Sequence, residues 1–153
     1  MRHLGVRSDP RAIAYAKSIR EEKFHFHALG FWSTDGPQTF FPPKDPTHVS
    51  HSIPNIQGTS TEGFVAMCRS LPSVMNELGH TRIDLLKLDV EGAEFEVLAP
   101  VVRGETSPRI LAIEFHPQSL SSLRETLRFV RKLGDQGYQV LAREGWNLTL
   151  ERT

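Results

Sequence analysis

The sequence predicts an α/β fold: a mostly parallel β-sheet covered by helices, with an antiparallel hairpin at the C-terminus. Helical and extended patterns alternate along the chain, which is typical of parallel strands joined by helical crossovers. Residues 83–88 and 110–115 are short apolar runs of the kind found in buried inner strands. Residues 138–142 and 148–151 are extended segments around a Glu144-Gly145 turn, and they predict the closing hairpin.

The composition indicates one soluble domain over residues 1–153. The chain has 18 basic and 18 acidic residues, which argues against nucleic acid or an acidic membrane as a partner held by charge. The polar N-terminus lacks the pattern of a signal peptide, and no apolar run is long enough to cross a membrane. As written, the chain is expected to be cytoplasmic, unless a longer form carries a targeting segment upstream. Cys68 lies in an apolar segment and is expected to be a buried, unreactive thiol.

The first half of the chain is predicted to contain a helix, a strand, a long loop and a second helix. Asp9 and Pro10 begin a helix that reaches about residue 22, since a capping residue followed by proline is typical of a helix start. Residues 24–29 alternate and are rich in aromatic side chains, as in a strand, and residues 30–32 extend it. Residues 38–58 contain several prolines and no apolar period, and they predict a loop.

The second helix is predicted to begin at Ser60 or Thr61 and to be interrupted by Pro72. A short further helical piece follows, and Gly79 ends it as a left-handed cap. The apolar side chains of the second helix recur at helical spacing at Phe64, Met67, Cys68 and Leu71.

The second half of the chain continues the alternation. The strand over residues 83–88 is expected to be covered on both faces, and a turn at residues 89–92 leads into a short helix that Pro100 stops. The strand over residues 110–115 ends before Pro117, and an amphipathic helix follows. The apolar face of that helix is formed by Leu120, Leu123, Leu127 and Val130.

Polar side chains gather at the ends of the two apolar strands. Asp89 and Glu91 follow the first strand, and Glu114 and His116 end the second. In open α/β sheets ligands bind beyond the carboxyl ends of the strands, and neighbouring parallel strands bring these ends to one edge. These four residues are therefore the candidate catalytic residues, either as a general base or as groups that border a substrate.

Each of these residues also has a purely structural interpretation. Asp89 could be the N-cap of the next helix, and Glu91 suits a helix start because of the helix dipole. Glu114 and His116 lie on the same side of a strand, where the alternatives are a base, a pair of metal ligands and hydrogen-bonded strand-end residues.

The remaining lysine, glutamate and histidine side chains near these strands are expected to have structural roles. Lys87 is expected to pair with a carboxylate inside the strand, and Glu94 is expected to be a solvated helix residue. No metal site is predicted, because His25 and His27 share a strand face but have no Cys or Asp nearby to complete a ligand set.

Residues 83–98, with the sequence IDLLKLDVEGAEFEVL, resemble the FkbM-type and related methyltransferase families. The family pattern is an apolar strand, then Lys-x-Asp-x-Glu-Gly-x-Glu, then a short helix that ends in Val-Leu. Residues 113–116 are similar to the next family strand, in which apolar residues precede Glu-x-His. The resemblance runs from about Asp9 to the C-terminus. The motif positions are Lys87, Asp89, Glu91, Gly92 and Glu94.

The resemblance implies a Rossmann-like methyltransferase sheet with S-adenosylmethionine as cofactor. The methyl group would pass to an acceptor, usually a hydroxyl oxygen of a sugar or another small molecule, by an in-line displacement that requires close alignment. Asp9 matches an acidic residue that, in the family, ends the second strand and accepts hydrogen bonds from the ribose hydroxyls. The residues that would border the acceptor are Asp89, Glu91, Glu114 and His116.

The sequence departs from the family at its N-terminus. No Gly-x-Gly pattern follows a strand, although the family places such a turn against the amino-acid portion of the cofactor. The chain is therefore expected to lack the first strand or strands and to begin near the end of the second. One alternative is an inactive remnant that serves as an interaction module or forms a homodimer through an open sheet edge. Another is a metal-dependent hydrolase built on Asp89, Glu114 and His116.

Overall fold

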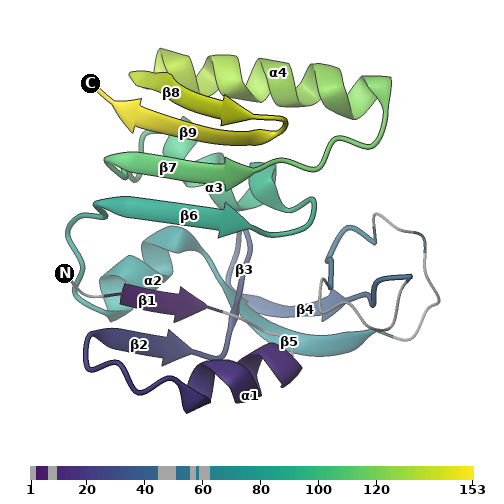
Figure 1. The fold of residues 1–153 in the computed structure, drawn as a ribbon, viewed down its shortest axis with the longest axis vertical. Helices are drawn as coiled ribbons and strands as arrows, with labels where there is room; N and C mark the ends of the chain where they lie inside the picture. The colour runs from purple at the N-terminus through teal and green to yellow at the C-terminus, as the bar shows by residue number, and fades with distance from the viewer. Residues whose placement is uncertain (1–2, 7–9, 45–50, 56–57, 59–62) are drawn as a thin grey trace.

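A computed structural model describes residues 3–6, 10–44, 51–55, 58 and 63–153 (Figure 1). It has an α/β fold, as predicted, and the predicted order of its C-terminal elements is confirmed. None of the described helices is long and apolar enough to span a membrane. The elements are β1 (His3–Val6), α1 (Pro10–Ser18), β2 (Phe24–His27), β3 (Gly30–Phe31), β4 (Gly36–Phe40), β5 (Phe64–Arg69), α2 (Leu71–Glu77), β6 (Leu85–Asp89), α3 (Glu94–Val102), β7 (Ile110–Glu114), α4 (Leu120–Asp135), β8 (Tyr138–Glu144) and β9 (Asn147–Arg152).

The described strands form three sheets, in the orders β1-β2, β3-β5-β4 and β6-β7-β9-β8. Within each sheet the pairs β1–β2, β3–β5 and β6–β7 are parallel, whereas β4–β5, β7–β9 and β8–β9 are antiparallel. The mostly parallel arrangement is therefore not confirmed, but the antiparallel C-terminal hairpin is. Figure 1 shows β1, β2, β6 and β7 running in the same direction.

One face of the four-stranded sheet carries the main hydrophobic core. Its inward side chains pack with Val97 and Leu98 of α3 and with Leu133 of α4. On the opposite face Leu85 is 54% exposed and Lys87 is also exposed, and no helix lies in front of β6 or β7 in Figure 1. The expectation that residues 83–88 are covered on both faces is wrong, because both helices that follow these strands lie on the same side. The inward side chains are Leu86, Leu88, Leu111, Ile113, Leu148 and Leu150.

Helix α4 forms as predicted but is rotated relative to the expected apolar face. Leu120 and Leu127 are more than half exposed, whereas Thr126 and Leu133 are buried. Thr126 can be buried at low cost because its hydroxyl donates a hydrogen bond to the Ser122 carbonyl at 2.9 Å. The helix begins with a capping box, in which the Ser119 and Ser122 side chains each accept a hydrogen bond from the other's backbone N–H.

The segment predicted as a loop followed by a helix contains two paired strands instead. Strand β4 (Gly36–Phe40) extends into the start of the predicted loop, and the predicted helix contains β5, which pairs with β4 and β3. Short apolar runs fit both helical and strand spacing, and here strand pairing decides. The close approach of these strands requires Gly30, because a Cβ atom there would lie 2.6 Å from the Cys68 Sγ atom and 2.7 Å from Phe40.

Two prolines have effects that differ from the prediction. Pro72 does not interrupt a helix but lies in the first turn of α2, where a missing N–H costs nothing, and Ser70 is the N-cap. Pro100 does not stop α3, which continues to Val102. Pro100 is fully buried, so its packing in the core offsets the lost backbone hydrogen bond.

Candidate functional site

The candidate site lies at the carboxyl ends of β6 and β7. Asp89 is the last residue of β6, and Glu114 is the last residue of β7. The two residues pair directly in the parallel register, so their side chains point to the same face of the sheet. The prediction that the two strand ends meet at one edge is confirmed.

The turn after β6 has an unusual backbone. Glu91 has φ of 47° and Gly92 has φ of 91°, so two consecutive residues adopt left-handed conformations. Glycine adopts this conformation without strain, whereas another residue type loses about 1–3 kcal/mol. The backbone is therefore relaxed at Gly92 and strained at Glu91. The turn places the Glu91 carboxylate above the ends of the strands, beside His116.

Asp89 does not cap helix α3. The N-cap is Ala93, and no side chain caps this helix through a hydrogen bond. The structural interpretation of Asp89 as an N-cap is therefore wrong, because Val90, Glu91 and Gly92 separate Asp89 from the first helical turn. Its side chain instead lies 37% exposed at the end of the strand.

Glu94 is buried and orients His116. Its side chain is only 3% exposed, and its Oε1 atom lies 2.8 Å from the Nδ1 atom of His116. The same Oε1 atom accepts a hydrogen bond from the backbone N–H of Gly92 at 2.8 Å. An ionised carboxylate only accepts hydrogen bonds, so Nδ1 of His116 carries a proton and Nε2 faces the other side. The expectation that Glu94 is a solvated helix residue is wrong.

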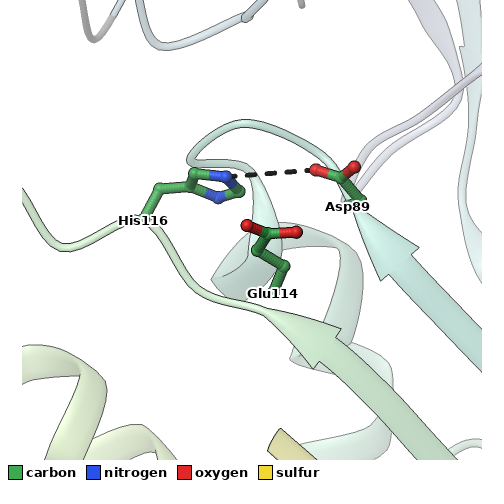
Figure 2. A group of neighbouring side chains, drawn as sticks. All are labelled: Asp89, Glu114 and His116. Atoms are coloured by element: carbon green, nitrogen blue, oxygen red, sulfur yellow. Dashed lines mark ion pairs between the residues drawn. The ribbon is translucent and has the colours of Figure 1, made fainter. Parts of the chain in front are cut away.

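The Nε2 atom of His116 faces a group of carboxylates. It lies 3.7 Å from Glu91 Oε2 and 3.9 Å from Asp89 Oδ1, distances too long for hydrogen bonds. Asp89, Glu114 and His116 each offer one ligand atom, and these atoms lie within 4.8 Å of one another. Figure 2 shows the three side chains converging from the two strand ends. We call Asp89, Glu91, Glu94, Glu114 and His116 the strand-end cluster.

The electrostatics of the cluster favour the protonated imidazole. The hydrogen bond with Glu94 is the main cause of a raised pKa of His116, and partial burial opposes it. The negative charges of Glu94, Glu91 and Asp89 raise this pKa further. Among the described residues, no basic side chain other than His116 forms an ion pair with these carboxylates. The cluster is therefore rich in negative charge.

A small pocket of about 150 Å³ adjoins the cluster on the uncovered face of the sheet. Asp89 and Glu114 line one end of it. Small-molecule sites usually enclose roughly 300–1,000 Å³, so this pocket can receive a hydroxyl-bearing fragment but not a nucleoside. Lys87 also lines the pocket, and it forms no ion pair with a carboxylate among the described residues, contrary to the expected pairing inside the strand. The other lining residues are Leu88, Ala112, Ile113, Asn147, Leu148 and Thr149.

The structure brings together four of the five residues predicted for the site. Asp9, predicted to bind ribose, lies outside the described residues. Glu94 was assigned a structural role on the surface, although its position in the Glu-Gly-x-Glu motif was a signal for a functional one. Its partner His116 is 22 residues away, and only the pairing of β6 with β7 brings the two together.

The arrangement supports two kinds of chemistry. An imidazole held by a buried carboxylate through Nδ1 can accept a proton at Nε2, as general bases do. Two carboxylates and an imidazole that converge on one point can also bind a cation. Asp89 and Glu114 belong both to the cluster and to the lining of the pocket.

Comparison with known proteins agrees with the sequence motif. Residues 6–140 match the sequence model of the family described as the methyltransferase FkbM domain. This range contains the whole strand-end cluster. No curated protein and no solved structure matches the chain.

Proposed function

Because the chain belongs to the methyltransferase FkbM domain family, we propose that it is an S-adenosylmethionine-dependent methyltransferase whose acceptor is a hydroxyl oxygen of a sugar or another small molecule. Residues 1–153 would act as one domain. The described strands β1–β2 and β6–β7 belong to separate sheets, but all four run in the same direction in Figure 1, as the parallel strands of a Rossmann-like fold do. In such sheets the substrate lies beyond the carboxyl ends of the strands, where the strand-end cluster lies.

The observation that carries this proposal is the contact between Glu94 and His116. Methyl transfer to a hydroxyl requires removal of its proton, which the neutral form of an imidazole can accept at its free ring nitrogen. Because the pKa of His116 is raised, mainly by the hydrogen bond with Glu94, the population of this neutral form grows as the pH rises. The Nε2 atom of His116 would accept the proton, and the Glu94 carboxylate, 2.8 Å from Nδ1, would stabilise the imidazolium that forms. Asp89, Glu91 and Glu114 would border the acceptor and accept hydrogen bonds from its other hydroxyl groups.

The described residues do not by themselves fit the whole cofactor. The pocket of about 150 Å³ is smaller than a nucleoside requires, and no glycine-rich turn follows a described strand. Asp9, which we propose to contact the ribose, is not among the described residues. When bound, S-adenosylmethionine would supply the methyl group. The proposed contribution of the cluster is to hold the acceptor and to take up its proton.

Two measurements test the proposal. Calorimetric titration with S-adenosylhomocysteine should reveal saturable binding, and a sugar acceptor screen with radiolabelled S-adenosylmethionine should reveal transfer. In that assay His116→Gln should lower kcat by at least about 100-fold, since general bases contribute roughly 10²–10⁴. His25→Gln is the matched control, because His25 is exposed on β2. A folded chain that does not bind the cofactor product would contradict the proposal.

A second candidate function is that of an interaction module. Among the described strands, β6 hydrogen-bonds only to β7, so its other edge has unpaired backbone groups. Leu85, on this strand, is 54% exposed. Such an edge can pair with a strand of a second copy. Light scattering after size-exclusion chromatography tests this alternative: a dimer whose formation Leu85→Lys abolishes would support it, and a monomer at all concentrations would contradict it.

A further inference from the structure

We propose that Asp89, Glu114 and His116 bind a divalent transition-metal cation. The inference concerns binding at the strand-end cluster and stands whether or not the chain transfers methyl groups. It arises from three independent features: the distances among the ligand atoms, the fixed orientation of the imidazole, and the negative charge around it.

The distances are close to those of a metal site. The three ligand atoms lie within 4.8 Å of one another. Metal–ligand bonds to carboxylate oxygen and imidazole nitrogen are about 2.0–2.2 Å long, so neighbouring ligand atoms around one cation are about 3.0–3.6 Å apart. A movement of about 1 Å closes the site, and the side chain of Asp89, which is 37% exposed, can make it by rotation. Figure 2 shows the three side chains pointing toward one another at the ends of the two strands.

The imidazole is held as a metal-binding histidine is held. Histidine ligands almost always donate their second ring N–H to a carboxylate, a carbonyl or a water molecule, which fixes the tautomer and raises the basicity of the ligating nitrogen. Glu94 provides this contact at 2.8 Å, and it is itself held by the backbone N–H of Gly92. Glu94 is nearly fully buried and cannot reach the metal position as a ligand, so its contact with His116 is independent of the ligand set.

The charge of the cluster requires compensation. Asp89, Glu91 and Glu94 all pair with the same imidazole, and Glu114 lies at the same point without an ion pair of its own among the described residues. When Nε2 of His116 binds a metal, the imidazole is neutral and balances none of these carboxylates. A divalent cation placed between Asp89 and Glu114 would offset two of the four negative charges, while Glu91 would stay close enough to bind a metal-bound water molecule.

The donor atoms indicate which cations would bind. Carboxylate oxygen alone suits Mg²⁺ and Mn²⁺, whereas imidazole nitrogen favours later transition metals, so a mixed set prefers Zn²⁺ over Mn²⁺ and both over Mg²⁺. Three protein ligands leave open positions, as in catalytic metal sites. Because Asp89 and Glu114 line the pocket, these positions would be accessible to water or to a hydroxyl group.

A bound cation would change the role of His116 in the proposed reaction. The Nε2 lone pair can bind either a proton or a metal, but not both. With the cation in place, the metal would lower the pKa of a bound hydroxyl group. The carboxylate of Glu91, 3.7 Å from Nε2 of His116, could then accept the proton.

The test is calorimetric titration of the tag-free, chelator-treated chain with Mn²⁺ and Zn²⁺, together with the electron paramagnetic resonance spectrum of bound Mn²⁺. We expect one saturable site, with Zn²⁺ bound more tightly than Mn²⁺ and Mg²⁺ weakest. His116→Gln and Glu114→Gln should each weaken Mn²⁺ binding by at least about tenfold, and Glu94→Gln by about 10–100-fold. His25→Gln and Glu125→Gln, which alter exposed residues outside the cluster, should leave the affinity within about twofold.

Two results would overturn the inference: the absence of saturable binding to the folded chain, or binding that persists unchanged in His116→Gln and Glu114→Gln. Circular dichroism of each variant establishes that it is folded. If His116→Gln does not fold, Glu114→Gln decides the question alone, since Glu114 is partly exposed and has no ion pair among the described residues. Metal binding without binding of S-adenosylhomocysteine would contradict the proposed methyl transfer and support the metal site. Binding of S-adenosylhomocysteine without metal binding would contradict the metal site and support the proposed methyl transfer.

Discussion

Replacing Glu94 with alanine tests the buried contact on which the cluster depends. The Oε1 atom of Glu94 accepts a hydrogen bond from Gly92 at 2.8 Å and contacts His116 Nδ1 at 2.8 Å. Hydrogen bonds to charged groups contribute about 1.5–3 kcal/mol each, which gives a range of about 3–6 kcal/mol for two. The side chain of His116 is 19% exposed, so water can replace part of its lost bond. We therefore expect Glu94→Ala to lower the free energy of unfolding by about 3 kcal/mol.

Two further variants separate the charge of Glu94 from its hydrogen bonds. Glu94→Gln keeps an oxygen that can accept both bonds and loses only the charge, so a smaller loss of about 1 kcal/mol is expected. Glu96→Ala is the matched control, because Glu96 belongs to the same helix and is exposed, and its effect should stay within about 0.5 kcal/mol.

Urea denaturation in the presence of a chelator measures these differences. With a slope of about 2 kcal/mol per molar urea, a loss of 3 kcal/mol moves the midpoint by about 1.5 M. The slope itself should not change, since the same surface is exposed on unfolding. If Glu94→Ala moves the midpoint no more than Glu96→Ala does, the buried contact does not stabilise the fold and the reasoning fails.

Three other predictions concern the packing away from the site. Gly30→Ala should lower the free energy of unfolding by about 1–3 kcal/mol, because its Cβ atom would overlap Cys68 and Phe40. Gly134→Ala in α4, where the Cβ atom contacts no neighbouring atom, should instead raise this free energy by about 0.5–1 kcal/mol. Equal effects of the two variants in urea denaturation would refute this prediction. Tyr138→Phe should lower the free energy of unfolding by about 1–2 kcal/mol, because the buried Tyr138 hydroxyl donates a 2.6 Å hydrogen bond to the Pro108 carbonyl. An unchanged urea midpoint would show that this bond does not stabilise the fold. Burial raises the pKa of Cys68 to about 11, so at pH 8 only about one thiol in a thousand is ionised, and Ellman's reagent should react slowly until denaturant is added. A rapid reaction of the native chain would show that Cys68 is accessible.

Much of the C-terminal half could be predicted from the sequence. The apolar runs at β6 and β7, the amphipathic pattern of α4 and the turn at Gly145 are local signals, and each led to the correct element. The loop and the helix predicted before residue 70 were wrong at β4 and β5, respectively. The apolar spacing of residues 64–71 fits a helix, but pairing with two neighbouring strands stabilises residues 64–69 as a strand.

The sequence by itself determined the class of fold, the family motif and four of the residues that meet at the strand ends. Only the tertiary structure decided that Glu94 is buried against His116, that Asp89 is not a helix cap, and that one face of β6 is uncovered. The physical reason is that periodicity and capping act between residues a few positions apart. Burial and charge depend on the register between strands, which brings together residues 89 and 114 and residues 94 and 116.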